Sequence, residues 1–203
     1  VTDKNYSLTP ASSDASFRRY FRLQQMDSSF IVMDSPPEHE DNQSFIKVAT
    51  VLEQFGLNVP HIYQQDLQQG FLILSDLGNT PYLSQLSVET ADELYKKAID
   101  SLISLQQIPC ENQSLPQYEA SLLQREMQLF DDWFLQRHLG LNPPEWLAAT
   151  FDFLTLNALE QPQVIVHRDF HSRNLMYLQG QKPGIIDFQD AVVGAISYDL
   201  VSL

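Results

Sequence analysis

Apolar and polar positions alternate in short runs over the first third of the chain. From residue 16 to 23 the apolar side chains fall mainly on odd positions, the period of two that is typical of a strand. Apolar runs at 30–33, 58–63 and 71–74, bounded by proline, glycine and polar turns, predict three more strands. Between 41 and 55 the apolar positions recur at spacings of three and four, which predicts a helix closed by a glycine. This part should form a small sheet with one helix packed on it.

The period changes after Asp76-Leu77-Gly78. Helical spacing predicts helices over residues 87–107 and 118–139, and Pro143-Pro144 should open a third that runs to about residue 160. We therefore expect an α+β protein with a strand-rich lobe over 1–77 and a helical catalytic lobe over 78–203.

Composition narrows the class of protein. The 203 residues carry a formal charge of −14 and 43% hydrophobic residues, enough for a real core. The chain has only 12 lysines and arginines, and this small number argues against a nucleic-acid partner, because lysine and arginine bind phosphate backbones. The single cysteine excludes an internal disulfide, and neither a membrane-spanning run nor a signal peptide is evident, so we expect a cytoplasmic protein.

Three oxygen-bearing side chains near the end of the chain suggest phosphoryl transfer. Asp169, Asn174 and Asp187 lie in the stretch VHRDFHSRNLM and in the following IIDFQ. Phosphoryl transfer needs a carboxylate that accepts the proton of the attacking hydroxyl, and hard oxygen ligands for Mg²⁺. Alternatively these residues only cap turns in a surface hairpin.

The pattern His-x-Asp-x-x-x-x-Asn, followed by a strand that ends in Ile-Asp-Phe, resembles the catalytic core of the aminoglycoside phosphotransferase and choline kinase families. The resemblance implies a protein-kinase-like two-lobe fold with ATP and Mg²⁺ as cofactors. Asp169 would be the catalytic base and Asn174 and Asp187 the metal ligands, while His167 and Arg168 would hold the loop.

The nucleotide side is less clear in the sequence. The segment LILSDLG resembles the hinge of this family, where the main chain of Ser75 to Leu77 would hydrogen-bond adenine. A phosphate-covering loop is expected over residues 10–16, where Ser12, Ser13 and Ser16 are small enough for backbone N–H groups to approach phosphates. An ordinary strand end and a plain serine-rich turn remain the alternatives.

The lysine that contacts the α- and β-phosphates in kinases is missing. The corresponding strand offers Met33 and Asp34, and the first 75 residues contain only Lys4 and Lys47. We therefore hypothesise that Arg18 or Arg22 supports the phosphates.

Further segments resemble the bacterial anomeric sugar kinases of cell-wall recycling. These segments are ASFRRYFR, MDSPP, HRDFHSRNLM and IDFQDA, with the later Tyr198-Asp199-Leu200. The resemblance implies a small-molecule sugar partner, N-acetylmuramate or N-acetylglucosamine, phosphorylated at the anomeric hydroxyl. Arg173 would meet a phosphate or a substrate carboxylate, or else form a plain salt bridge. Asp190 would face substrate hydroxyls, and Asp199 would brace the catalytic loop.

Two other functions stay open. An aminoglycoside or other alcohol kinase shares the core motifs, and a nucleotide-binding pseudokinase would explain the missing lysine. The sequence stops at Leu203, before the helices that complete the acceptor site in the family, so we expect either a fragment or an incomplete acceptor pocket. We expect a monomer.

Overall fold

The N-terminal part is a five-stranded antiparallel sheet. The computed structural model describes residues 6–13, 17–111 and 113–203. The strand order is β1-β2-β3-β5-β4, with β1 at Tyr6–Ser13, β2 at Arg19–Gln25, β3 at Ser28–Asp34, β4 at Ile62–Asp66 and β5 at Phe71–Ser75. The sequence did not predict β1. The strand expected from 58 begins only at Ile62, because Pro60 cannot donate to a ladder and Asn58 instead accepts the Ile185 N–H at 2.6 Å.

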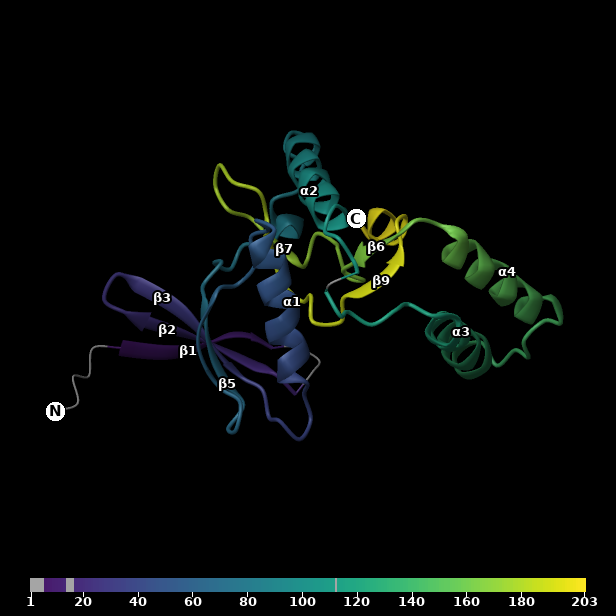
Figure 1. The fold of residues 1–203 in the computed structure, drawn as a ribbon, viewed down its shortest axis with the longest axis horizontal. Coiled ribbons are helices and arrows are strands. Elements are labelled where there is room, and N and C mark those ends of the chain that lie inside the picture. The colour runs from purple at the N-terminus through teal and green to yellow at the C-terminus, as the bar shows by residue number, and fades with distance from the viewer. Residues whose placement is uncertain (1–5, 14–16, 112) are drawn as a thin grey trace.

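Helix α1, Asn42–Gln54, packs across this sheet, as the spacing predicted (Figure 1). The Asp41 side chain caps its start by accepting the N–H groups of Gln43 and Ser44. Its apolar face lies in one cluster with buried side chains of β3 and β5, and Phe45 also meets the Phe188 ring at a centroid distance of 5.0 Å. The hydrophobic core thus continues from the sheet into the last fifth of the chain.

The second part is helical with two small antiparallel strand pairs. Its helices are η1 Tyr82–Ser84, α2 Ala91–Gln106, α3 Ala120–Leu129, η2 Phe130–His138, α4 Trp146–Glu160 and α5 Tyr198–Ser202. Strands β6 Gln163–Val166 and β9 Val192–Ala195 form one antiparallel pair, and β7 Leu175–Met176 and β8 Gly184–Ile185 form the other. No described helix is long and apolar enough to cross a membrane.

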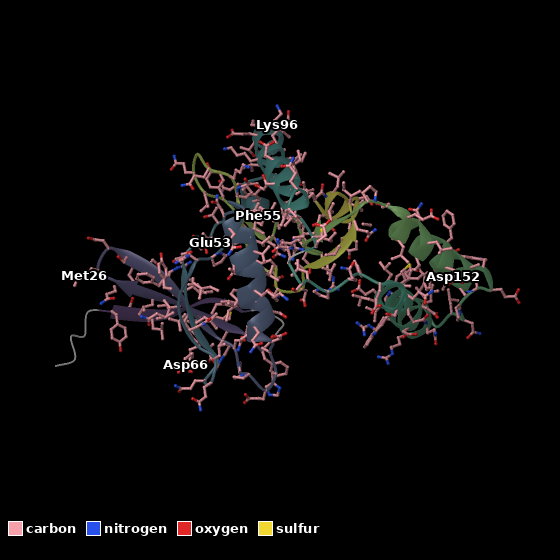
Figure 2. The ribbon with its side chains drawn as sticks, in the orientation of Figure 1. Met26, Glu53, Phe55, Asp66, Lys96 and Asp152 are labelled. Carbon is pink, nitrogen blue, oxygen red and sulfur yellow. The ribbon has the colours of Figure 1, made fainter. Side chains whose placement is uncertain are left out.

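The helix expected over 118–139 is wrong as a single α-helix. It becomes a π-helix, η2, at Phe130, where Asp131 is buried and receives hydrogen bonds from the Gln128 and Gln136 side-chain amides. Helices α3 and α4 extend beyond the β6/β9 pair, with exposed Asp152 on α4 (Figures 1 and 2). Tyr118, just before α3, ties them to this pair by packing with Val166 and Val192.

Candidate active site

A cavity of about 380 Å³ lies between the sheet and the segment around the β7/β8 pair. The sheet and α1 contribute Ala11, Tyr20, Arg22, Ile31, Phe45, Pro60, Leu74 and Ser75 to its wall. The later segments contribute Asp76, Leu77, Gly78, Asn79, Pro81, Arg173, Asn174, Met176, Ile186, Asp187 and Phe188. Aliphatic side chains from both parts therefore face a cavity that has two predicted metal ligands in its wall.

Buried His167 connects the two catalytic segments. Its Nδ1 accepts the N–H of Asp169 at 3.2 Å, so Nε2 carries the proton and donates to the Ile186 carbonyl at 3.0 Å. Burial lowers the pKa of His167 to about 4, which keeps the imidazole neutral at neutral pH. One side chain thus fixes the spacing between the Asp169 loop and the strand end that carries Asp187.

Asp199 holds the loop from behind. This fully buried carboxylate accepts the backbone N–H of His167 at 2.7 Å and that of Arg168 at 3.0 Å. Burial raises the pKa of Asp199 to about 6, while the two hydrogen bonds oppose the rise by favouring the charged form. These contacts agree with the bracing role that the family resemblance implies.

Asp169 is exposed at the turn of the loop. Its carbonyl accepts the His171 N–H at 2.9 Å and the Asn174 amide at 3.1 Å, so its backbone is fixed while its carboxylate faces solvent. Partial burial raises the pKa of this carboxyl group, and the negative charge of Asp187 raises it further. A raised pKa makes the group a better proton acceptor at neutral pH.

Asn174 and Asp187 meet at the cavity wall. The Asn174 amide donates to the Asp187 carboxylate at 3.3 Å, and the Gln189 amide donates to the other carboxylate oxygen at 2.8 Å. Asp187 has a φ of +64°, a left-handed conformation that aspartate adopts more readily than most residues. The described residues hold no group of three His, Cys, Asp or Glu side chains suited to a metal. A carboxylate and an amide nevertheless fit Mg²⁺, which takes one or two protein ligands and completes its shell with phosphates and water.

The predicted hinge forms another part of the cavity wall. The Asp76 carboxylate receives hydrogen bonds from Arg22 at 2.6 and 3.0 Å, from Gly78 N–H at 2.9 Å and from the Ser29 hydroxyl at 2.5 Å. Burial favours the neutral acid, but the hydrogen bonds from Arg22 and Ser29 hold the pKa of Asp76 below its ordinary value. Ser75 is fixed by its N–H, which donates to the His61 carbonyl at 2.8 Å. Three segments thus fix the shape of the hinge.

The candidates for phosphate binding are not all together. Ser16 lies outside the described residues, and the backbone of Ser12 and Ser13 belongs to β1 rather than to a loop. Arg18 is buried, forms an ion pair with Glu40 at 3.0 Å and is not among the described residues of the cavity wall. Arg22 lines the cavity, but its guanidinium holds Asp76 and the Gly78 carbonyl. Each of these two arginines therefore has a carboxylate partner inside the sheet lobe.

Arg173 and Asp190 differ in position. Arg173 is exposed, lines the cavity and forms no ion pair with any described residue, so the salt-bridge alternative gains no support. Asp190 is exposed outside the cavity wall, where its carbonyl accepts Arg168 at 3.5 Å. Arg173 is therefore the arginine of the cavity wall whose charge remains available to an anion.

Sequence reasoning missed several residues of the site. Tyr20 and Ile31 face the cavity from adjacent strands, and Gln189 hydrogen-bonds Asp187. The parity shared by Tyr20 and Arg22 signalled that both lie on one face of the strand. Which face it would be depends on the pairing of β2 with β3.

Comparisons with known proteins agree with this geometry. A sequence profile of the phosphotransferase enzyme family matches residues 7–203. An N-acetylmuramate/N-acetylglucosamine kinase of Pseudomonas aeruginosa is 50% identical over 200 residues, covering 97% of this chain and 59% of that protein. A kinase of the same name from Neisseria meningitidis serogroup B is 40% identical over 210 residues, covering 99% of this chain and 62% of that protein. The chain thus spans about three fifths of the length of these relatives.

Solved structures share the fold. An ADP-bound aminoglycoside phosphotransferase superposes with a TM-score of 0.68 at 17% identity, over 98% of this chain and 71% of that one. An ethanolamine kinase from Plasmodium vivax gives a TM-score of 0.67 at 13% identity, over 97% of this chain and 59% of that one. The α+β, protein-kinase-like fold is confirmed.

Proposed function

The chain belongs to the phosphotransferase enzyme family, and from that premise we propose an ATP- and Mg²⁺-dependent sugar kinase. Its acceptor is the anomeric hydroxyl of N-acetylmuramate or N-acetylglucosamine, the sugars in the names of the relatives at 50% and 40% identity. Residues 1–77 form the nucleotide lobe and 78–203 carry the catalytic residues. The enzyme acts as a monomer in the cytoplasm.

One observation carries the proposal. The Asn174 amide joins the backbone of Asp169 to the carboxylate of Asp187, at 3.1 and 3.3 Å, in the wall of a cavity that also contains the hinge. A surface hairpin that only caps turns would need neither the cavity nor the buried His167 and Asp199 behind the loop.

ATP enters the cavity with adenine between the aliphatic side chains of Ile31 and Leu74 and those of Met176 and Ile186. The main chain of Ser75 to Leu77 hydrogen-bonds the adenine edge. The triphosphate extends towards Asn174 and Asp187, which would hold Mg²⁺, and the ion would neutralise charge on the phosphates. Arg173 contacts a phosphate or a substrate carboxylate, and Asp190 faces sugar hydroxyls.

In the reaction Asp169 accepts the proton of the anomeric hydroxyl while that oxygen bonds to the γ-phosphorus. The bond to the β–γ bridging oxygen breaks, which yields the sugar 1-phosphate and ADP. Little covalent chemistry is left to the protein, so most of the acceleration comes from positioning and from charge neutralisation. The raised pKa of Asp169 suits this proton transfer.

The test is a mass-spectrometric screen of the full-length protein with ATP, Mg²⁺ and candidate acceptors. N-acetylmuramate and N-acetylglucosamine should each gain one phosphate, whereas transfer only to aminoglycosides or choline would favour an aminoglycoside or alcohol kinase. ATP binding without transfer to any acceptor would favour a pseudokinase.

Asp169→Asn should abolish turnover while retaining nucleotide, because the amide cannot accept the proton. Exposed Asp152, near the middle of α4 and outside the cavity wall, provides the matched control Asp152→Asn, which should leave turnover unchanged (Figure 2). Robust activity of the Asp169 variant would refute the base assignment.

A further inference from the structure

Helix α3 reaches the catalytic loop through one arginine. The guanidinium of Arg168, directly before Asp169, forms an ion pair with Glu126 of α3. The other carboxylate oxygen of Glu126 accepts the Tyr118 hydroxyl, and the Tyr118 ring lies 5.5 Å below the guanidinium carbon of Arg168. The Tyr198 hydroxyl, on α5, lies 3.4 Å from that of Tyr118. Arg168 is thus enclosed by a cluster that lines none of the cavity wall.

The backbone of Arg168 needs such a restraint. Its φ is +80°, a left-handed conformation that is unfavourable for a residue with a long side chain. The Arg168 N–H is held by Asp199 at 3.0 Å, and its side chain is held by Glu126. Because Asp169 follows directly, relaxation of Arg168 towards negative φ would turn the Asp169 carboxylate away from its present direction.

We propose that Glu126 and Tyr118 are positioning residues that hold Arg168 in its left-handed conformation and thereby aim Asp169 at the acceptor. This inference rests on the proposed kinase function. Neither residue touches the reacting atoms, so both act through Arg168.

Anchoring of α3 alone does not explain the contact. Tyr118, with the partly buried Leu122, Leu123 and Val164 around it, already packs against Val166 and Val192 of the β6/β9 pair. The ion pair lies beside this apolar contact and is directed at the loop, with the Arg168 and Glu126 side chains only 25% and 27% exposed. Loss of the Glu126 charge would leave the guanidinium partly buried without a carboxylate partner, with the Tyr118 ring at 5.5 Å and the Asp190 carbonyl at 3.5 Å as its remaining contacts.

Glu126→Gln in the full-length protein tests this role. We expect kcat to fall roughly 10- to 100-fold, because a displacement of about 1 Å in a catalytic group lowers the rate by this order in enzymes. The KM for ATP should stay unchanged, because the cluster lies outside the cavity wall. Tyr118→Phe keeps the ring and should lower kcat less. When Glu126→Gln is already present, adding Tyr118→Phe should not lower kcat further, because the Tyr118 hydroxyl acts through Glu126. Exposed Glu119, at the start of α3, gives the control Glu119→Gln with the same charge change and unchanged kcat.

Hydrogen exchange gives a readout that does not depend on activity. Glu126→Gln should speed the exchange of a peptide covering residues 167–175 while α1 exchanges as in the wild type. The proposal is overturned if Glu126→Gln shows the same kcat and loop exchange as Glu119→Gln, or if it raises the KM for ATP while kcat is unchanged. It is also overturned if Tyr118→Phe lowers kcat by the same factor with Glu126 and with Gln at position 126. A wild-type enzyme that phosphorylates no acceptor would refute the proposed function, and loop exchange would then decide the positioning role by itself.

Discussion

Replacing His167 by glutamine should remove a large pH dependence of folding stability. The imidazole is buried and neutral, with Nδ1 accepting the Asp169 N–H and Nε2 donating to the Ile186 carbonyl. Burial lowers its pKa from 6.5 to about 4, because the charged form would lose its water. In the unfolded chain the same group takes up a proton near its ordinary pKa.

The sign and magnitude follow from these two pKa values. Above pH 6.5 both states are neutral, and as the pH falls towards 4 the unfolded state binds the proton first and is stabilised by it. Between about pH 7.5 and about pH 5 the folded state should lose about 2 kcal/mol through His167 alone, at 1.36 kcal/mol for each unit of pKa difference. Glutamine cannot titrate, so the variant should lack this loss. A lost hydrogen bond should lower its stability by about 1 kcal/mol at every pH.

Urea unfolding followed by fluorescence or circular dichroism at each pH measures this effect. The wild-type stability minus the variant stability should fall by about 2 kcal/mol from about pH 7.5 to about pH 5, from about +1 to about −1 kcal/mol. Carboxylates titrate equally in both proteins and cancel in the difference. Exposed His138 on η2 supplies the matched control, His138→Gln. A difference that stays constant over this range would refute the claim that His167 is neutral because it is buried.

Three other substitutions test the parts around the cavity. Gly70→Ala should lower the free energy of unfolding in urea by roughly 2 kcal/mol or more, because φ is +80° and a Cβ would lie 2.2 Å from the Ser35 carbonyl oxygen. Gly56→Ala, where φ is +77° and the space is open, should lower it by only about 1 kcal/mol. Equal losses in the two variants would contradict the clash with Ser35. Asp76→Asn should raise the KM for ATP several-fold by releasing Arg22 from the hinge, with kcat nearly retained, and an unchanged KM would contradict this role. Arg173→Ala should also raise the KM for ATP or for an acidic acceptor, whereas exposed Arg125→Ala on α3 should change neither, and identical kinetics of the two variants would remove Arg173 from the site.

The sequence predicted those elements whose stability depends on their own apolar pattern. Helix α1 begins and ends within a residue of the predicted limits, because Asp41 caps it and Gly56 takes a positive φ beyond it. Strands β3 and β5 were predicted from apolar runs, and both lie in the middle of the sheet. Strand β1 was missed because it is an edge strand with exposed residues and a register shift between Pro10 and Ser12. Its ladder is made by backbone groups, which any sequence can supply.

Within the site, residue types were predictable and partners were not. The spacing placed Asp169, Asn174 and Asp187 in one short hairpin, and the Asn174 amide contacts both the Asp169 backbone carbonyl and the Asp187 carboxylate. Nothing in the sequence indicated that Glu126, 42 residues before Arg168, would be its ion-pair partner. Long-range pairing depends on how α3 packs against the β6/β9 pair, and this packing follows from the whole fold.

For the proposed kinase, the arginines bear on how a chain without the kinase lysine would bind a triphosphate. Strand β3 supplies no cation, since Met33 is in the core and Asp34 pairs with Arg19. Arg22 neutralises Asp76, so the pair fixes the hinge without adding net charge to the cavity. In the proposed enzyme we therefore infer that positive charge at the phosphates would come from the catalytic segment, through Arg173 and the cation that Asn174 and Asp187 would hold. In the proposed enzyme the sheet would determine the shape and orientation of the nucleotide site, while the loop that contains Asp169 would supply both the base and the charge.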